Sequence, residues 1–144
     1  MSAPENAEAM SGGCLCGAVR FSAIPQHAEM DVCHCSMCRR WSGGVFMGVM
    51  CVAGSLSLEN ESALGIYTSS EWGERCFCKQ CGSNLFWRMQ DGSACAVSAQ
   101  AFDDPQAFAF TMQIYVEEQP ANYTFANETK RLTGAEVTAM FAGN

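Results

Sequence analysis

Short runs of apolar, strand-forming residues separated by turn residues recur along most of the chain. Residues 18–24 (AVRFSAI) alternate in part between apolar and polar side chains and end at Pro25, whereas residues 45–52 (VFMGVMCV) are continuously apolar. The first pattern is typical of a half-buried strand and the second of a strand buried on both faces. Comparable patterns predict further short strands at 56–58, 64–68, 74–77, 84–89, 94–99 and 110–117.

One helix is predicted, at the C-terminal end. Residues 133–136 (TGAE) match a capping box, and Val137, Met140 and Phe141 follow at helical spacing. Closely spaced strands with Gly and Asn/Asp turns and little helix are typical of a mainly β, antiparallel domain.

Composition indicates a single globular domain. With 144 residues, 49% hydrophobic and 16% charged, the chain fits one domain and has no room for a second sizeable core. Residues 1–11 are acidic and rich in small side chains, so we expect a flexible tail there and one domain over 12–144. The tail lacks the basic and apolar regions of a signal peptide, and no run reaches the roughly 18–20 apolar residues of a membrane span. We therefore expect a cytoplasmic protein without membrane contact.

Charge and cysteine content narrow the class of function. The net charge is −7 and there is no basic run, which argues against nucleic-acid binding. Ten cysteines in a chain without an export signal argue against a disulfide scaffold. In a reducing compartment, closely spaced cysteines are better explained as metal ligands or catalytic thiols.

Two cysteine pairs, Cys14/Cys16 and Cys78/Cys81, have the spacing of half-sites for a metal. A tetrahedral zinc needs four soft ligands, and one turn can supply two of them. Together the pairs predict a structural zinc site that joins the N-terminal loop to the middle of the sheet. The spacing alone leaves an alternative, because Cys76 extends the second pair to a CxCxxC pattern, which would leave Cys14 and Cys16 to complete another site.

A third group, Cys33, Cys35 and Cys38, supplies three thiols within six residues. Zinc with three thiolates carries a charge of 2 − 3 = −1, which makes it a weak Lewis acid toward water but a good acceptor for a fourth soft ligand, such as a substrate thiol. With seven thiolates on two zinc ions, the net charge becomes −7 − 7 + 4 = −10. Alternatively the group is structural, with its fourth ligand from His34, Cys51, Cys76 or Cys95. In an extended segment, the side chain of His34 would point away from its two cysteine neighbours.

Three arginines are candidate substrate-binding residues. Arg39 and Arg40 directly follow the three-cysteine group, and Arg75 precedes the Cys78/Cys81 pair. A planar guanidinium pairs well with carboxylates and also offsets thiolate charge.

The sequence resembles the glutathione-dependent formaldehyde-activating enzyme (GFA) family. The resemblance covers roughly residues 12–117 and rests on three motifs in order, GGCLCGAVRF at 12–21, CHCSMCRR at 33–40 and FCKQCGSNLF at 77–86. It implies a β-tent fold, seen also in Rab-exchange-factor-like and methionine sulfoxide reductase B-like proteins.

The resemblance also implies a metal content and a reaction. It places a structural zinc on Cys14, Cys16, Cys78 and Cys81, which excludes Cys76, and a catalytic zinc on the three-cysteine group. We therefore expect a carbon–sulfur lyase that adds a small thiol such as glutathione to formaldehyde or another small aldehyde, or catalyses the reverse. The alternatives are a non-catalytic, zinc-stapled binding module and, ranked last, a methionine-sulfoxide-reductase-like redox enzyme that uses Cys76 or Cys95.

Overall fold

The computed structural model describes residues 8–142, in which the chain forms two β-sheets, two α-helices and several short 3-10 turns. The helices are α1 (Ser36–Ser42) and α2 (Gly134–Ala142). The strands are β1 (Met10–Gly13), β2 (Arg20–Ala23), β3 (Glu29–Cys33), β4 (Phe46–Cys51), β5 (Ser57–Glu59), β6 (Leu64–Thr68), β7 (Gly73–Cys78), β8 (Asn84–Met89), β9 (Cys95–Ser98), β10 (Ala109–Ile114) and β11 (Lys130–Leu132).

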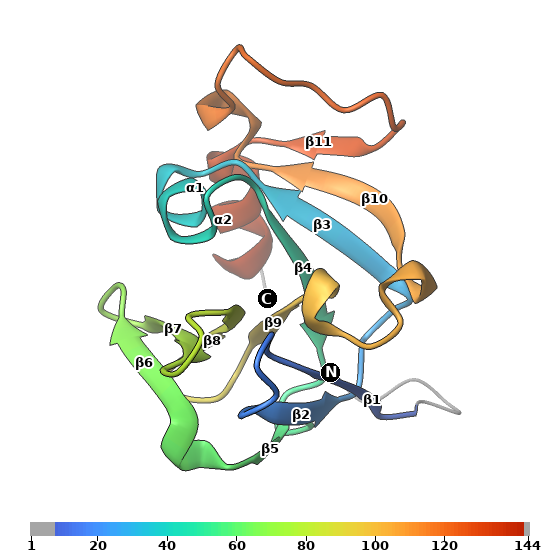
Figure 1. Ribbon diagram of the computed structural model, residues 1–144. Coiled ribbons are helices and arrows are strands. Elements are labelled where there is room, and N and C mark those ends of the chain that lie inside the picture. Colours follow the sequence, from blue (N-terminus) through green and yellow to red (C-terminus); the bar gives the residue numbers. More distant parts are fainter. Residues whose placement is uncertain (1–7, 143–144) are drawn as a thin grey trace.

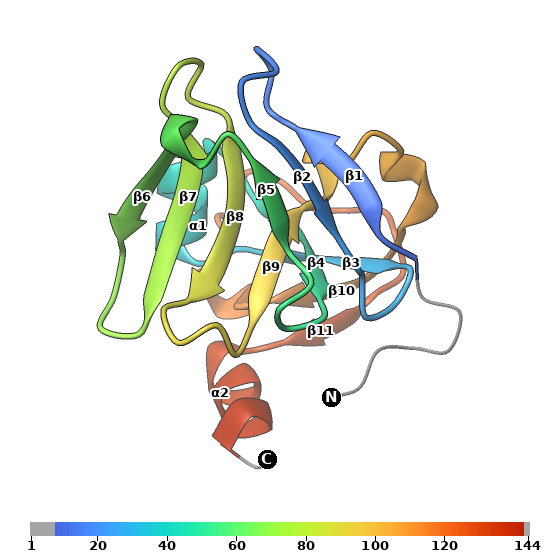
Figure 2. The same ribbon diagram turned by 90° about the horizontal axis from the view of Figure 1, so that it is seen from below.

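The strands form a large and a small sheet. The large sheet has the order β11-β10-β3-β4-β9-β8-β7-β6, and the small sheet has the order β1-β2-β5. In Figure 1, the small sheet lies at the end of the molecule opposite to both α-helices, and Figure 2 shows its three strands side by side. The predicted mainly β fold with a C-terminal helix is confirmed. The described strands are not all antiparallel, however, because β10 pairs in parallel with both β3 and β11.

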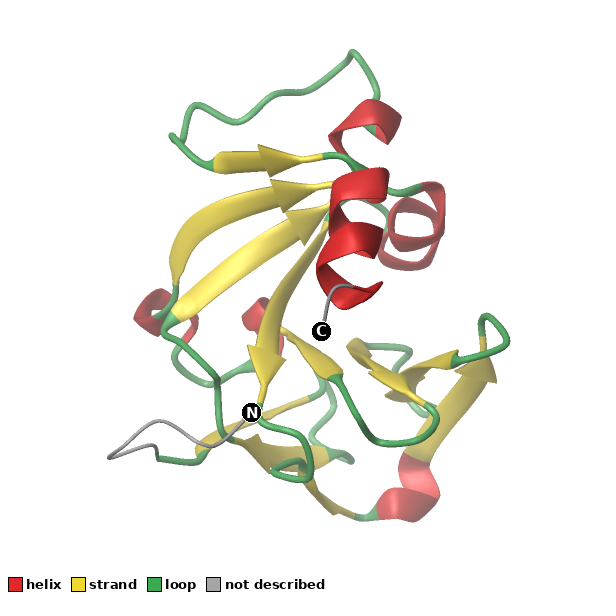
Figure 3. Ribbon diagram, turned by 180° about the vertical axis from the view of Figure 1, so that it is seen from behind, coloured by secondary structure: helices red, strands yellow, loops and turns green. Residues whose placement is uncertain are grey.

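The parallel strands place both helices at one edge of the large sheet. Because β3, β10 and β11 run in the same direction, their C-terminal ends meet at that edge (Figure 3). Strand β3 leads into α1 and β11 leads into α2. The end of β3 is therefore covered by elements from distant parts of the sequence.

Strand β4 separates two hydrophobic cores, which explains its continuously apolar sequence. Val49 and Cys51 belong to the main core, whereas Phe46 belongs to a smaller core with Cys33 and Cys38. Side chains on both faces of β4 are thus buried, as the run at 45–52 predicts. The main core also contains the fully buried residues Val19, Leu85, Phe86 and Val97.

Several elements differ from the sequence prediction. The segment after Cys35 is helix α1, with Cys35 as its N-cap, an element that the sequence pattern does not predict. Of the tail expected at 1–11, residues 1–7 lie outside the described residues, while Met10 and Ser11 pair with β2 as part of β1. Residues 143–144 of the expected domain also lie outside the described residues. No helix in residues 8–142 is long and apolar enough to cross a membrane.

Candidate metal centres

Four thiols from two distant loops meet at one end of the small sheet. Cys14 and Cys16 follow β1, Cys78 ends β7 and Cys81 lies in the turn before β8. Their Sγ atoms all lie within 4.8 Å of one another, with 3.7 Å between Cys14 and Cys16 and 3.7 Å between Cys16 and Cys78. Tetrahedral zinc with Zn–S bonds of about 2.3 Å places its sulfurs about 3.8 Å apart. These four thiols, here called the closed cluster, therefore fit a four-thiolate metal ion.

Two tight turns shape the closed cluster. Gly17 (φ 82°) donates its N–H to the carbonyl of Cys14, and Gly82 (φ 79°) donates to the carbonyl of Cys78. Backbone N–H groups of Val19 and Gln80 point at the sulfurs of Cys14 and Cys78, each at 3.3 Å. Hydrogen bonds to a sulfur favour its thiolate form. The turns thus hold the sulfurs close together, in the arrangement that a metal ion requires.

The second group, here called the open cluster, consists of Cys33, Cys35 and Cys38. Cys33 ends β3, and Cys35 caps α1 by accepting the backbone N–H of Cys38 at 3.3 Å. The three Sγ atoms lie within 4.8 Å of one another, and among the described residues no further His, Cys, Asp or Glu joins them. Cys33 and Cys38 are buried, whereas Cys35 is half-buried. Access to this cluster is therefore easiest on the Cys35 side.

Because the three thiols of the open cluster lie close together, each of them shifts the pKa of the other two. Hydrogen bonds from Cys33 and Cys38 lower the pKa of the Cys35 thiol to about 2. The hydrogen bond to Cys35 in turn raises the pKa of Cys33 far above its ordinary value. One of the three cysteines is therefore stable as a thiolate, whereas ionisation of a second is opposed by repulsion between the two negative charges. A divalent cation removes that repulsion, so the donor set fits a metal.

Arg75 is a buried cation beside the open cluster. Its Nη1 and Nη2 atoms lie 3.7 and 3.8 Å from Cys38 Sγ, and its guanidinium lies 5.2 Å from the centre of the Trp41 ring. The side chain is only 6% exposed, and its Nε has no hydrogen-bond partner among the described residues. A buried charge requires compensation. A metal ion that binds Cys38 as a thiolate places a negative charge beside Arg75, and the two charges then compensate each other.

The other two candidate arginines lie on α1. Arg39 donates from Nε to the carbonyl of His34 at 2.8 Å, which ties the helix to the open cluster's own loop. Arg40 is exposed. The three predicted arginines therefore occupy different environments, and of the three it is Arg75 that contacts a cluster sulfur.

His34 lies between two cysteines of the open cluster but is not close to their sulfurs. Its ring is fully buried, with Nδ1 2.7 Å from the Tyr123 hydroxyl and Nε2 2.8 Å from Gln113 Oε1. Its backbone N–H donates to the carbonyl of Ile114. His34 thus anchors the cluster's loop to β10. Sequence reasoning missed Gln113 and Tyr123, because no motif connects them to the cysteines.

The remaining cysteines belong to the main core. Cys51 and Cys95 face each other across β4 and β9, and Cys76 is fully buried in β7. Burial raises the pKa of Cys51 and of Cys95 to about 12 and that of Cys76 to about 11. These thiols stay protonated at neutral pH, which makes them poor nucleophiles. None of them belongs to either cluster of the described residues.

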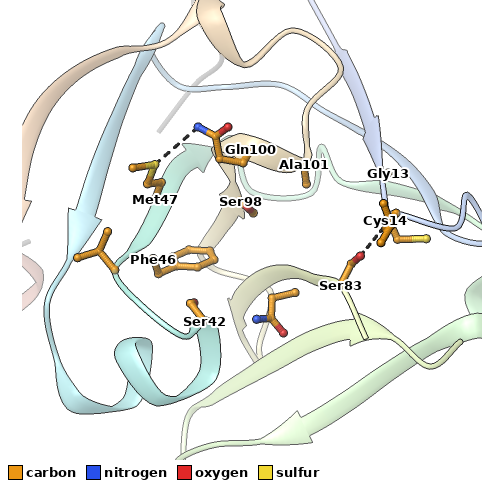
Figure 4. A pocket seen from close by; sticks show the side chains of 12 residues that line it. Gly13, Cys14, Ser42, Phe46, Met47, Ser83, Ser98, Gln100 and Ala101 are labelled. Carbon is orange, nitrogen blue, oxygen red and sulfur yellow. Dashed lines mark hydrogen bonds between the residues drawn. The ribbon is translucent and has the colours of Figure 1, made fainter. Parts of the chain in front are cut away.

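A cavity of about 480 Å³ separates the loop that carries Cys14 from helix α1. Figure 4 shows Ser42, Phe46 and Met47 on one side of it and Cys14 and Ser83 on the other. Phe46 also packs with Cys33 and Cys38, so one residue borders both the cavity and the open cluster. The sequence contains no motif for this cavity, because its walls come from four separate stretches of the chain, within 13–15, 42–47, 83–84 and 98–101.

Comparisons with known proteins place the chain in a family. The profile of the glutathione-dependent formaldehyde-activating enzyme family matches residues 9–118. An uncharacterized lyase of Schizosaccharomyces pombe is 35% identical over 127 residues, which cover 88% of this chain and 92% of that protein. A Halomonas elongata protein, provisionally named a glutathione-dependent formaldehyde-activating enzyme, is 33% identical over 85 residues, 54% of each chain.

A solved structure supports the fold. The crystal structure of a Rhodobacter sphaeroides protein superposes with a TM-score of 0.58 at 22% sequence identity, and covers 65% of this chain and 88% of that one. At this identity the likeness concerns the fold alone. The family profile spans both cysteine clusters and the strands between them. The chain therefore belongs to the glutathione-dependent formaldehyde-activating enzyme family.

Proposed function

We propose that this protein adds a small thiol, glutathione or a relative, to formaldehyde or another small aldehyde, or catalyses the reverse reaction as a carbon–sulfur lyase. The open cluster is the observation that carries the proposal. Its three thiols have no fourth His, Cys, Asp or Glu partner among the described residues, so a metal held there has a free position for a substrate. Membership of the family supports glutathione and formaldehyde as the substrates.

The proposal assigns one zinc ion to each cluster. The closed cluster holds a structural ion, because four thiolates complete a tetrahedron. Cys33, Cys35 and Cys38 hold a catalytic ion. Zinc bound there supplies a soft Lewis acid that lowers the pKa of a thiol ligand and keeps it as thiolate at neutral pH.

The side chains around the open cluster then have distinct roles. Cys33 and Cys38 are buried and exclude water, while the half-buried Cys35 marks the side from which substrate enters. Arg75 offsets the negative charge that accumulates when a fourth sulfur joins three thiolates. Positioning the nucleophile in this way lowers the entropic cost of the reaction.

Arg39 and Arg40 are proposed to bind the carboxylates of the thiol substrate. Both lie on α1, directly after the last cysteine of the open cluster. The Arg39 Nε is engaged with the carbonyl of His34, so its terminal nitrogens remain to contact a ligand. A planar guanidinium pairs with a carboxylate through two hydrogen bonds.

Addition of glutathione to the cobalt-loaded protein tests the proposal. Thiolate binding to cobalt at the open cluster should increase the sulfur-to-metal charge-transfer absorption at millimolar glutathione. The Cys35→Ala variant should lose this response, whereas Cys51→Ala, which changes a core cysteine outside both clusters, should retain it. Formation of S-(hydroxymethyl)glutathione on addition of formaldehyde is then followed by NMR.

An unchanged spectrum at saturating glutathione would contradict the open position. If both metals remain bound and no adduct forms with any aldehyde, the zinc-stapled binding module becomes the better description.

A further inference from the structure

We propose that the 480 Å³ cavity between α1 and the Cys14 loop binds an uncharged carbonyl compound with a short apolar body, larger than formaldehyde. This inference rests on the proposed function, because it identifies the class of the aldehyde substrate. Ligand sites in proteins typically span about 300–1,000 Å³. Formaldehyde, with two non-hydrogen atoms, would leave most of this cavity empty.

The cavity adjoins the open cluster through α1 and β4. Ser42 lines the cavity and lies four residues after Cys38 on α1, so the two side chains share one face of the helix. Phe46 lines the cavity as well and packs against Cys33 and Cys38. Phe46 therefore borders both the cavity and the open cluster, whose three cysteines are not themselves among the residues that line the cavity.

The charges around the cavity disfavour an anionic ligand. None of the described residues that line it is Asp, Glu, Lys, Arg or His. Cys14, at one end, belongs to the closed cluster, which with zinc carries 2 − 4 = −2. Glutathione has two carboxylates and one ammonium group and is therefore a net anion. Its body is repelled from the Cys14 end of the cavity. The thiol substrate's body stays outside, and the carbonyl substrate occupies the cavity.

The lining matches an amphipathic ligand. Val45, Phe46 and Met47 contribute apolar surface, while Ser42 and Ser98 contribute hydroxyl groups. The Ser42 Oγ is buried and has no hydrogen-bond partner among the described residues. An unpaired buried hydroxyl is unfavourable, and a carbonyl oxygen that the Ser42 hydroxyl reaches by rotation about one side-chain bond would satisfy it.

The inferred step balances without an oxidant or reductant. The thiol sulfur forms a bond to the carbonyl carbon, and the π-electron pair of the C=O bond moves to oxygen. That oxygen takes the proton released by the thiol, and the product is a hemithioacetal. Ser42 donates a hydrogen bond to the same oxygen while the negative charge develops.

Binding of hexanamide, an unreactive and uncharged carbonyl compound, tests the site directly. In titrations of the zinc-loaded protein followed by ¹H–¹⁵N NMR, the shifts should cluster on Phe46, Met47 and Ser98, and hexanoate should bind at least tenfold more weakly. Ser98→Leu, which fills the cavity opposite Gly48, should weaken hexanamide binding at least tenfold. Ser57→Leu, on β5 outside this cavity, is the matched control and should bind as the wild type does.

Ser42→Ala gives a second variant in case Ser98→Leu does not fold, and it should weaken hexanamide binding several-fold. Hexanamide shifts elsewhere on the surface, or hexanoate bound as well as hexanamide, would overturn the inference.

A kinetic experiment tests the same site. At a fixed glutathione concentration, the KM for the aldehyde should fall at least tenfold from formaldehyde to hexanal in the wild type but not in Ser98→Leu. If formaldehyde is turned over but KM does not depend on the chain length of the aldehyde, the inference about the cavity is contradicted and the proposed function stands. If hexanamide binds in the cavity but no adduct forms with any aldehyde, the inference about the cavity is supported and the proposed function is contradicted.

Discussion

At the scale of single residues, Arg75 is the most informative side chain. It is 6% exposed, and both terminal nitrogens lie within 3.8 Å of Cys38 Sγ. Burial of a cation costs several kcal/mol unless an opposite charge compensates it. The location of Arg75 is therefore best explained if Cys38 is a thiolate in the working protein. The sequence alone cannot distinguish this charge-compensating role from the binding of a substrate carboxylate.

Removal of the Arg75 charge should weaken zinc binding at the open cluster. Arg75→Met keeps an apolar chain against Trp41 but leaves the negative charge of the open cluster uncompensated. We therefore expect about 10- to 100-fold lower zinc affinity, the loss that is typical when a residue that contacts a metal ligand is changed. Zinc release to a chromophoric chelator measures the loss. Arg75→Lys should restore part of the affinity, and Arg40→Met, which changes an exposed arginine on α1, should release zinc like the wild type. Equal release from Arg75→Met and Arg40→Met would exclude this role.

At the scale of elements, the tight turns are what bring the sulfurs of the closed cluster together. In the turn between β7 and β8, Gly82 adopts φ 79° and donates its N–H to the carbonyl of Cys78 at 2.9 Å. This left-handed conformation costs an L-residue about 1–2 kcal/mol. The glycine thus lets Cys78 and Cys81 face the same point.

A pair of glycine variants separates turn strain from metal binding. Gly92, in the turn between β8 and β9, has φ 81° and donates its N–H to the carbonyl of Met89 at 3.0 Å. A Cβ at either glycine meets nothing within 4 Å. Gly82→Ala and Gly92→Ala should therefore both lower the free energy of unfolding by about 1 kcal/mol. Only Gly82→Ala should also accelerate zinc loss from the closed cluster. Thermal unfolding and chelator kinetics measure the two effects, and equal zinc loss from both variants would contradict the assignment.

At the scale of the whole molecule, the closed cluster connects the two sheets. Cys14 and Cys16 follow β1 of the small sheet, whereas Cys78 and Cys81 belong to the turn between β7 and β8 of the large sheet. The open cluster instead lies at the edge where the parallel strands end. Metal at the two clusters should consequently contribute differently to stability.

Stepwise metal removal should reveal this difference. We expect two zinc ions per chain, of which a mild chelator removes one from the open cluster with little change in the melting temperature. A strong chelator should remove the second and unfold the protein, because structural zinc contributes about 10–16 kcal/mol of apparent binding free energy. Metal analysis should find one ion in Cys35→Ala and two in Cys51→Ala. Simultaneous loss of both ions, or unfolding at the first step, would contradict the division into open and closed clusters.

The sequence predicted most of the fold because its signals are local. The strands at 64–68 and 84–89 agree with β6 and β8, and the capping box forms as predicted, with Thr133 and Glu136 exchanging two hydrogen bonds. Helix α1 was missed because its sequence has no apolar periodicity and its N-cap is a cysteine. The parallel pairing of β10 was missed because strand direction depends on contacts between distant segments.

The sequence by itself determined that closely spaced cysteines form local ligand groups, because CxC and CxxC spacings keep their sulfurs near one another through the local backbone, but this spacing left Cys76 as an alternative member of the second motif. Only the tertiary structure decided which motifs meet, since Cys16 and Cys78 are 62 residues apart. It also placed Arg75 on Cys38, buried His34 against Gln113, and left a cavity beside Phe46. These features depend on strand order and packing. Short-range spacing cannot encode them.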